Sequence, residues 1–126
     1  MDTHIWVRWI LNNNPLPPSI LDIIETSDAV AVSAISIWEV VLLEKRKRIE
    51  LPCTIEEWIS EALAGSDVES LPITTEIAYL ASMLPEHHKD PADRLIIATS
   101  VLGNFQLISL DTLFPLYLEL KDNLIA

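Results

Sequence analysis

The feature that most constrains the fold is the alternation of short apolar runs with longer segments of helical periodicity. Residues 29–32 and 105–110 are apolar runs typical of buried strands, and residues 68–73 are predicted to be a strand or an extended segment. Strands separated by helices pair in parallel and are covered by helices on both faces. We therefore predict an α/β fold with three layers, α/β/α, in which helices cover one short parallel sheet, in a single domain of residues 1–126. The predicted helices cover residues 4–11, 19–27, 33 or 36 to 45, 54–64, 74–83 and 91–102. The tail at residues 116–126 is either a last short strand or a helix, and the sequence leaves this choice open.

The helix at residues 91–102 begins with two acids beside an almost wholly apolar sequence. Asp90 stands at the N-cap, Pro91 at the first helical position and Asp93 two residues further on, and Gly103 and Asn104 end the helix. Both acids have a structural explanation, because they can satisfy free amides and the positive end of the helix dipole. The alternative is that one of the two acids binds a ligand. The positions of the other acids in the chain help to decide between the structural role and ligand binding.

Three further carboxylates stand beside apolar sequence. Glu39 lies on or next to the apolar stripe of its helix, where an ionised group is costly unless a cation or water meets it. Asp111 lies at the carboxyl end of the strand 105–110, where ligands of open α/β sheets bind, although it could instead cap the short turn 112–114.

Asp2 precedes the first helix, as a residue at a strand end would. Such a strand should hold about four to six apolar residues, and the sequence begins with a single Met before Asp2. Either translation starts further upstream, or the domain works without that strand.

Asp2, Glu39, Asp93 and Asp111 stand in equivalent places beside apolar sequence. Four such carboxylates in one pocket would repel one another and raise each other's pKa unless a counter-charge were present. Mg²⁺ and Mn²⁺ prefer oxygen ligands and are the natural counter-charge. A metal held by Asp and Glu can orient and deprotonate a water and stabilise the charge that builds on a phosphate. The four acids therefore indicate metal-assisted phosphodiester chemistry.

The net charge of −11 does not suit direct neutralisation of nucleic-acid phosphates and favours a cationic partner or a metal. Half of the eight Lys and Arg residues form one run at 45–48, which we interpret as a solvated helix end whose cations complement the helix dipole. His87 and His88 are adjacent without a third ligand at metal-site spacing, and we interpret them as surface residues.

Composition excludes several other classes. Two glycines cannot build a phosphate-binding loop, and the apolar runs are shorter than the roughly 18 to 20 residues that a membrane span needs. The first residues do not resemble a signal peptide. A single cysteine, Cys53, forms no intrachain disulfide, which agrees with a reducing cytoplasm.

In four places the chain resembles PIN-domain proteins of the VapC toxin type, the ribonuclease half of type II toxin–antitoxin pairs. The similar motifs are DTHIW at 2–6, VSAISIWE at 32–39, HKDPADRLIIA at 88–98 and ISLD at 108–111, in the family's order and spacing. The second and third are the specific ones. The resemblance implies a PIN-like fold and a Mg²⁺- or Mn²⁺-dependent endoribonuclease. It implies that the metal-binding catalytic residues are Asp2, Glu39, Asp93 and Asp111.

By the same resemblance, Asp90 and Arg94 have structural or accessory roles. The expected partners are an RNA substrate and a cognate antitoxin that wraps the toxin and blocks the acidic site, and homodimers are common in the family. A surface of net charge −11 would suit a basic antitoxin.

Two departures from the family pattern keep a second interpretation open. The strand before Asp2 is missing, and Leu110 stands where the family often has Arg. The alternative is a PIN-like module that binds an antitoxin without cutting RNA. A two-component receiver domain also shares the length and the acidity, but residues 50–60 offer neither the required Asp nor a clear strand, and Asp111 occupies the late position where that class needs a Lys.

Overall fold

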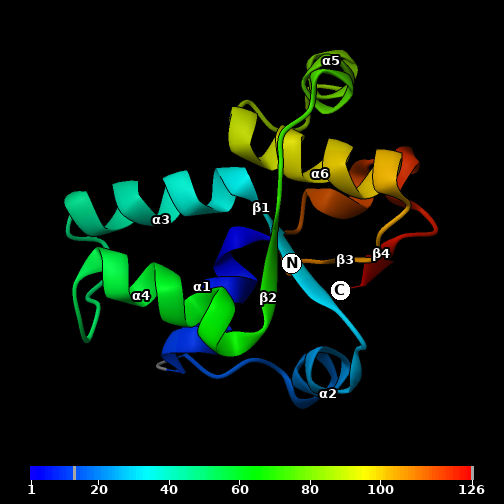
Figure 1. The fold of residues 1–126 in the computed structure, drawn as a ribbon. Coiled ribbons are helices and arrows are strands. Elements are labelled where there is room, and N and C mark those ends of the chain that lie inside the picture. The colour runs from blue at the N-terminus through cyan, green and yellow to red at the C-terminus, as the bar shows by residue number, and fades with distance from the viewer. Residues whose placement is uncertain (13, 126) are drawn as a thin grey trace.

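The computed structural model describes residues 1–12 and 14–125, and helices alternate with short strands along them. Figure 1 shows the strands in the middle of the molecule, with α2 on one side and α5 and α6 on the other. The elements are α1 (Thr3–Leu11), α2 (Pro18–Thr26), β1 (Val30–Ser33), α3 (Ala34–Lys45), α4 (Ile55–Ala62), η1 (Ala64–Ser66), β2 (Val68–Leu71), α5 (Thr75–Met83), α6 (Pro91–Gly103), β3 (Leu107–Ile108), η2 (Phe114–Leu116), η3 (Leu118–Leu120) and β4 (Leu124–Ile125), where η denotes a 3₁₀ helix.

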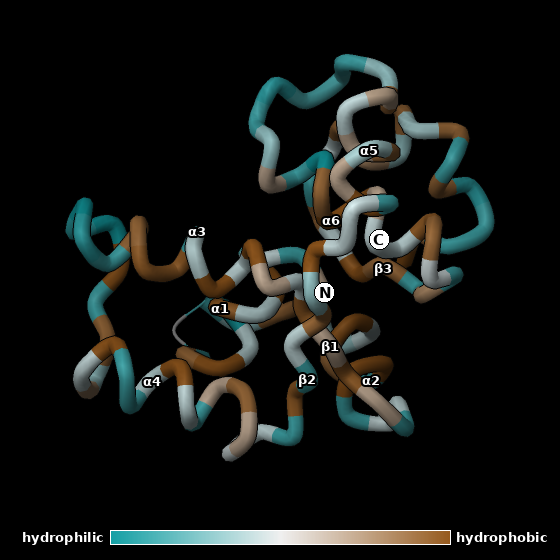
Figure 2. The backbone as a smooth tube through the Cα atoms, turned by 45° about the horizontal axis from the view of Figure 1, so that its top comes forward, coloured by the Kyte–Doolittle hydropathy of each residue, from teal (hydrophilic) through white to brown (hydrophobic). Residues whose placement is uncertain are grey.

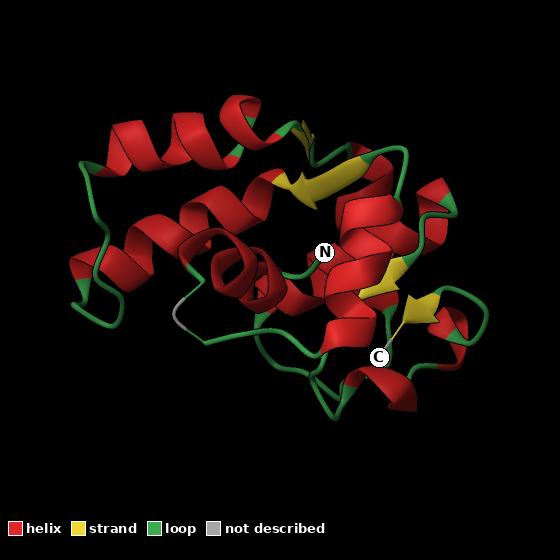
Figure 3. Cartoon of the chain, turned by 90° about the horizontal axis from the view of Figure 1, so that it is seen from below, coloured by secondary structure: helices red, strands yellow, loops and turns green. Residues whose placement is uncertain are grey.

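The described strands form two parallel pairs with the first residues of the chain between them. β1 pairs with β2, and β3 pairs with β4. The amine of Met1 donates to the carbonyl of Ala31 at 3.0 Å, and the amide of Asp2 donates to the carbonyl of Ile108 at 3.0 Å. Figures 1 and 3 place the N-terminus between the two pairs. The prediction of an α/β fold with parallel pairing is confirmed, although two short sheets stand where we expected one.

Local capping explains where the helices begin. The side chains of Thr54, Thr74 and Asp90 accept hydrogen bonds from backbone amides two or three residues further on, at 3.0 to 3.2 Å. Ser33 does the same for α3, and so settles which of the two serines caps that helix. α6 ends at Asn104, whose φ of 52° is the left-handed conformation that Asn tolerates.

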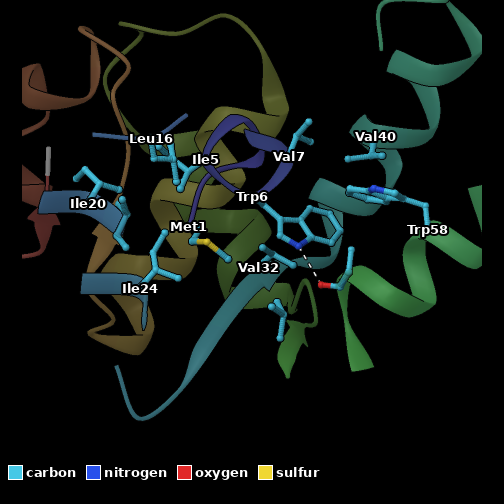
Figure 4. Close-up of a cluster of buried hydrophobic side chains, with 13 residues drawn as sticks. Met1, Ile5, Trp6, Val7, Leu16, Ile20, Ile24, Val32, Val40 and Trp58 are labelled. Carbon is cyan, nitrogen blue, oxygen red and sulfur yellow. Dashed lines mark hydrogen bonds between the residues drawn. The ribbon is translucent and has the colours of Figure 1, made fainter. Parts of the chain in front are cut away.

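Two hydrophobic clusters hold the layers together. In the larger one Trp6 of α1 and Trp58 of α4 pack with ring centroids 5.1 Å apart, and the indole of Trp6 donates to the carbonyl of Ala62 at 3.1 Å (Figure 4). The second cluster joins α5 and α6 to β3 and the C-terminal 3₁₀ helices. Figure 2 shows apolar residues along β1 and on α2, and hydrophilic residues at the turn after α3.

Three boundary predictions were wrong or incomplete. The helix from 54 ends at Ala62 instead of 64, because Leu63 leaves the helical conformation, and Gly65 lies in η1. The strand 105–110 shrinks to Leu107–Ile108, because its partner β4 has two residues. The tail 116–125 contains both a 3₁₀ helix and a strand, a choice that the sequence left open, and residue 126 lies outside the described residues.

None of the helices in the described ranges is long and apolar enough to cross a membrane.

Candidate active site

The four predicted acids come from four segments and lie in one neighbourhood. Asp2 is the N-cap of α1, Glu39 lies in the middle of α3, Asp93 lies in the first turn of α6, and Asp111 follows β3. Their charges are coupled in a chain. Asp2 raises the pKa of Glu39, and Glu39 and Asp111 both raise the pKa of Asp93.

Asp2 is buried, and both of its carboxylate oxygens accept hydrogen bonds. Oδ1 accepts from the amide of Ile5 at 2.8 Å, which caps α1. Oδ2 accepts from the hydroxyl of Ser109 at 2.5 Å, and this bond joins the start of α1 to the segment after β3. Asp2, which the sequence suggests as a strand end, is therefore the cap of a helix in the structure.

Glu39 is half-buried and is held by the first turn of α1. The hydroxyl of Thr3 donates to Glu39 and lies 2.8 Å from the hydroxyl of the buried Ser36. Burial raises the pKa of Glu39, the hydrogen bond from Thr3 lowers it, and the charge of Asp90 raises it again. The pKa of Glu39 therefore lies above the ordinary value, which means that its surroundings destabilise the ionised form of this carboxylate.

The pKa of Asp93 is raised to about 6 from an ordinary 3.8. Burial at the mouth of α6 is the largest cause, the charge of His88 opposes it, and the neighbouring carboxylates add to it. A carboxylate in this position gains from any cation that enters the site.

Asp111 behaves in the opposite way. Burial alone would raise its pKa, but the amide of Leu113, which donates at 2.8 Å, and the ring of His88, with Nε2 at 3.0 Å, together hold the pKa below the ordinary value. The bond from Leu113 is the turn cap that the sequence offered as an alternative role. Asp111 therefore stays ionised. Leu113 is its structural partner through the turn, and His88 is its electrostatic partner.

His88 is the residue that the sequence interpretation missed. It is buried, with 6% of its surface exposed, and its ring stacks on Tyr117 and meets the edge of Phe114. Nε2 lies 3.0 Å from Asp111 and 4.0 Å from Asp93. The prediction of a surface histidine was wrong for His88 and holds only for the exposed His87.

The phenol of Tyr117 fixes the ring of His88. Its oxygen accepts the backbone amide of His88 at 3.0 Å and lies 3.0 Å from Nδ1. Because the phenol has one proton and already accepts from the amide, donation of that proton to Nδ1 leaves the Nε2 proton facing Asp111. The signal available in the sequence was the position of His88 directly before the Asp90 and Asp93 motif.

Asp90 and Arg94 have structural roles. Asp90 caps α6 through the amide of Ala92. The guanidinium of Arg94 donates to four backbone carbonyls of the segment that leads into α6, and so fixes its path; they belong to Ser82, Leu84, Pro85 and His88.

The donor set fits a divalent cation. Ligand atoms of His88, Asp93 and Asp111 all lie within 4.8 Å of one another, and Glu39 is coupled to this group. In the described part of the chain, the salt bridges to these acids come from His88 alone, so no Lys or Arg neutralises them there. Carboxylate oxygens suit Mg²⁺ and Mn²⁺, and the imidazole adds a nitrogen that Mn²⁺ accepts more readily than Mg²⁺.

Comparison with known proteins gives two matches. The family model of the PIN domain matches residues 1–117. The chain is also 32% identical over 112 residues to Ribonuclease VapC22 of Mycobacterium tuberculosis, an alignment that covers 88% of this chain and 85% of that protein. No solved structure gives a significant match.

Proposed function

The chain belongs to the PIN-domain family, and from that premise we propose that it is a metal-dependent endoribonuclease, the toxin of a type II toxin–antitoxin pair. A relative that matches most of both chains is named a ribonuclease, which supports this activity. The single observation that carries the proposal is the group of acids at the mouth of α6, where Asp93 has a pKa of about 6 and no Lys or Arg neutralises it among the described residues.

We propose that Glu39, Asp93 and Asp111 hold Mg²⁺ or Mn²⁺, with Asp2 as the fourth acid of the site. When bound, such a cation supplies a positive charge that activates water and stabilises a phosphate under attack. Both oxygens of Asp2 already accept hydrogen bonds, so Asp2 contributes through its remaining lone pairs and through its charge.

The chain's own residues orient these acids. Thr3 directs one oxygen of Glu39, and His88 directs one oxygen of Asp111. Because the donors come from elements that pack against one another, the carboxylates keep their positions before substrate arrives. Pre-positioned groups of this kind lower the cost of reaching the transition state.

The chain offers one concentrated basic surface to the phosphate backbone of a substrate. The run at 45–48 is exposed at the C-terminal end of α3. Lys45 lies about 9 Å along the helix from Glu39, at 1.5 Å per residue. We propose that this run contacts RNA phosphates next to the cleaved bond, which offsets the net charge of −11 locally.

The partners follow from the family. We propose a cognate antitoxin as the protein partner and a homodimer as the working form. Several large apolar side chains are exposed and are available for such contacts; among them are Trp38, Tyr79, Met83 and Leu118.

The test is the double variant Glu39→Gln with Asp93→Asn, compared with a control that removes two exposed acids, Asp22→Asn with Glu119→Gln. Cleavage of a fluorescent RNA should disappear in the first and persist in the second. Calorimetry with Mn²⁺ alone should show binding lost in the first only. Equal cleavage by the two variants, with contaminating nuclease excluded, would overturn the catalytic assignment. Unchanged Mn²⁺ binding would overturn the metal site.

A further inference from the structure

Trp38 is an exposed aromatic side chain next to one of the candidate metal ligands. It directly precedes Glu39 in α3, and 56% of its surface is exposed. It belongs to neither hydrophobic cluster, and its ring pairs with no other aromatic ring among the described residues. The other exposed aromatic residues of the described ranges, Tyr79 and Phe105, are distant in sequence from the four acids. The packing of the fold therefore does not account for the position of the Trp38 ring.

The helical periodicity of α3 separates the face of Trp38 from the buried face. Ser36 and Val40 are fully buried and, at four residues apart, mark the side of α3 that faces the core. Trp38 lies two residues from each of them, which turns the helix by about 200°, so its side chain points to the opposite side. Lys45, which is exposed, lies seven residues further on, on the same side and about 10 Å along the helix. Figure 1 shows α3 extending from the strands to the edge of the molecule, where the basic run follows.

Glu39 lies on the flank of α3, about 100° around the helix from Trp38. The hydroxyl of Thr3 holds Glu39 from the side of α1, and the charge of Asp90, at the start of α6, raises the pKa of Glu39. The acids therefore gather between α1, α3 and the start of α6, and Trp38 lies on the solvent side of this group. Consecutive Cα atoms are about 3.8 Å apart, so a phosphate held at Glu39 has its flanking bases within reach of the Trp38 ring.

A stacking contact suits the charge of this chain. The net charge is −11, and the run at 45–48 is its one concentrated positive surface. Proteins that bind single-stranded nucleic acid combine a positive surface for the backbone with aromatic rings on which bases stack. Because stacking depends little on net charge, it adds affinity for RNA that the composition of this chain does not otherwise supply.

We propose that Trp38 is a stacking platform for a base of single-stranded RNA, next to the phosphate held at the acids and on the strand that continues along α3 toward the basic run. The inference rests on the proposed ribonuclease function and adds the substrate class, which is unpaired RNA. A base within a duplex is stacked between its neighbours, whereas an unpaired base can turn its face to an aromatic side chain. Every base has such a face, so the platform tolerates different sequences.

The experiment measures RNA binding separately from RNA cleavage. The parent protein is the Glu39→Gln and Asp93→Asn double variant in EDTA, and the probe is a fluorescein-labelled single-stranded RNA of about twelve nucleotides that contains all four bases. Trp38→Leu removes the ring from this parent, and Trp38→Phe keeps a smaller ring. The matched control is Phe105→Leu, because Phe105 is 48% exposed and follows α6 at the end opposite to Asp93. Affinity is measured by fluorescence anisotropy.

Trp38→Leu should weaken binding about 5- to 100-fold, Trp38→Phe should recover most of the affinity, and Phe105→Leu should match the parent. The ratio of the affinities of the parent and Trp38→Leu should be the same at about 50 and about 200 mM salt, because stacking releases no counterions. Binding should also quench the Trp emission of the parent, and most of this quenching should be absent in Trp38→Phe.

Equal affinities of Trp38→Leu and the parent would overturn the inference, and so would a loss that Trp38→Phe does not recover. A parent that fails to bind the RNA at about 100 μM, the weak end of non-specific binding to nucleic acid, would overturn it as well. A Trp38→Leu protein whose mass by light scattering differs from the parent's would also overturn it, because the ring would then lie between two copies of the chain. The expected binding results together with an unmutated chain that cuts no RNA would support the stacking site and count against the proposed catalysis alone.

Discussion

Replacement of Asp93 by Asn should stabilise the metal-free protein. The folded-state pKa of Asp93 is about 6, above the ordinary 3.8, so the folded chain keeps a proton that the unfolded chain has released between pH 4 and 6. The contribution of this residue to stability therefore falls as the pH rises through that window. One pKa unit corresponds to about 1.4 kcal/mol, which gives about 3 kcal/mol as an upper value, and partial solvent exposure lowers it to about 1 to 3 kcal/mol.

The assay is thermal unfolding in EDTA at pH 7.5 and at pH 4, with Asp22→Asn as the control for a lost negative charge. At pH 7.5 Asp93→Asn should raise the Tm by about 4 to 10 °C, and at pH 4 the gain should nearly vanish, because Asp93 is then mostly protonated in the folded protein. The control should change the Tm little at either pH. A gain that is equal at both pH values, or no larger than the control's, would refute the explanation by burial and crowding of Asp93.

Three further predictions test the caps, the core and the metal site. Thr54→Ala should lower the free energy of unfolding in urea by about 1 kcal/mol and leave RNA cleavage unchanged, because its hydroxyl caps α4. Trp6→Phe should lower the free energy of unfolding in urea by about 1 to 2 kcal/mol more than Trp58→Phe does. The reason is that the indole of Trp6 donates to the carbonyl of Ala62, whereas the indole nitrogen of Trp58 has no partner within the described ranges. Equal losses in the two variants would contradict this. The affinity for Mn²⁺, measured by calorimetry, should fall about tenfold per pH unit below the pKa of Asp93, which is near 6, and should level off above pH 7. The reason is that Asp93 must be ionised to bind the metal. A constant affinity from pH 7 to pH 5 would contradict this prediction.

Features set by nearby residues could be predicted from the sequence. The starts of α4, α5 and α6 follow from Thr54, Thr74 and Asp90, whose side chains bond amides two or three residues away. The length of β3 could not be predicted in this way. A strand needs partners, and the partners of β3 are a two-residue strand near the C-terminus and the amide of Asp2, more than a hundred residues earlier.

The candidate site could likewise be predicted only where nearby residues determine it, and not where it depends on distant contacts. Asp2 and Asp93 stand at helix starts, Asp111 follows a strand, and Glu39 lies in the middle of a helix, on or beside its apolar stripe. Local patterns indicate all of these places, and the role of the acids in catalysis stays a prediction. His88 could not be placed, because its burial depends on Phe114 and on Tyr117, which lie more than twenty residues later in the chain, and Tyr117 belongs to the tail whose structure the sequence left undecided. A histidine next to an acidic motif therefore needs the long-range aromatic contacts before it can be assigned to the surface or to the site.

The hydrogen bonds around the acids show how the fold keeps a crowded anionic group in place. The donors to Asp2, Glu39 and Asp111 are hydroxyls, backbone amides and an imidazole, and among the described residues no guanidinium or ammonium bonds to these three acids. Hydroxyl and amide donors orient a carboxylate without cancelling its charge, so the burial and the repulsion that raise the pKa of Asp93 act until a cation arrives, opposed only in part by His88. The same arrangement that costs stability in the free protein is therefore the source of affinity for a divalent metal, and an Arg or Lys in the place of His88 would remove both.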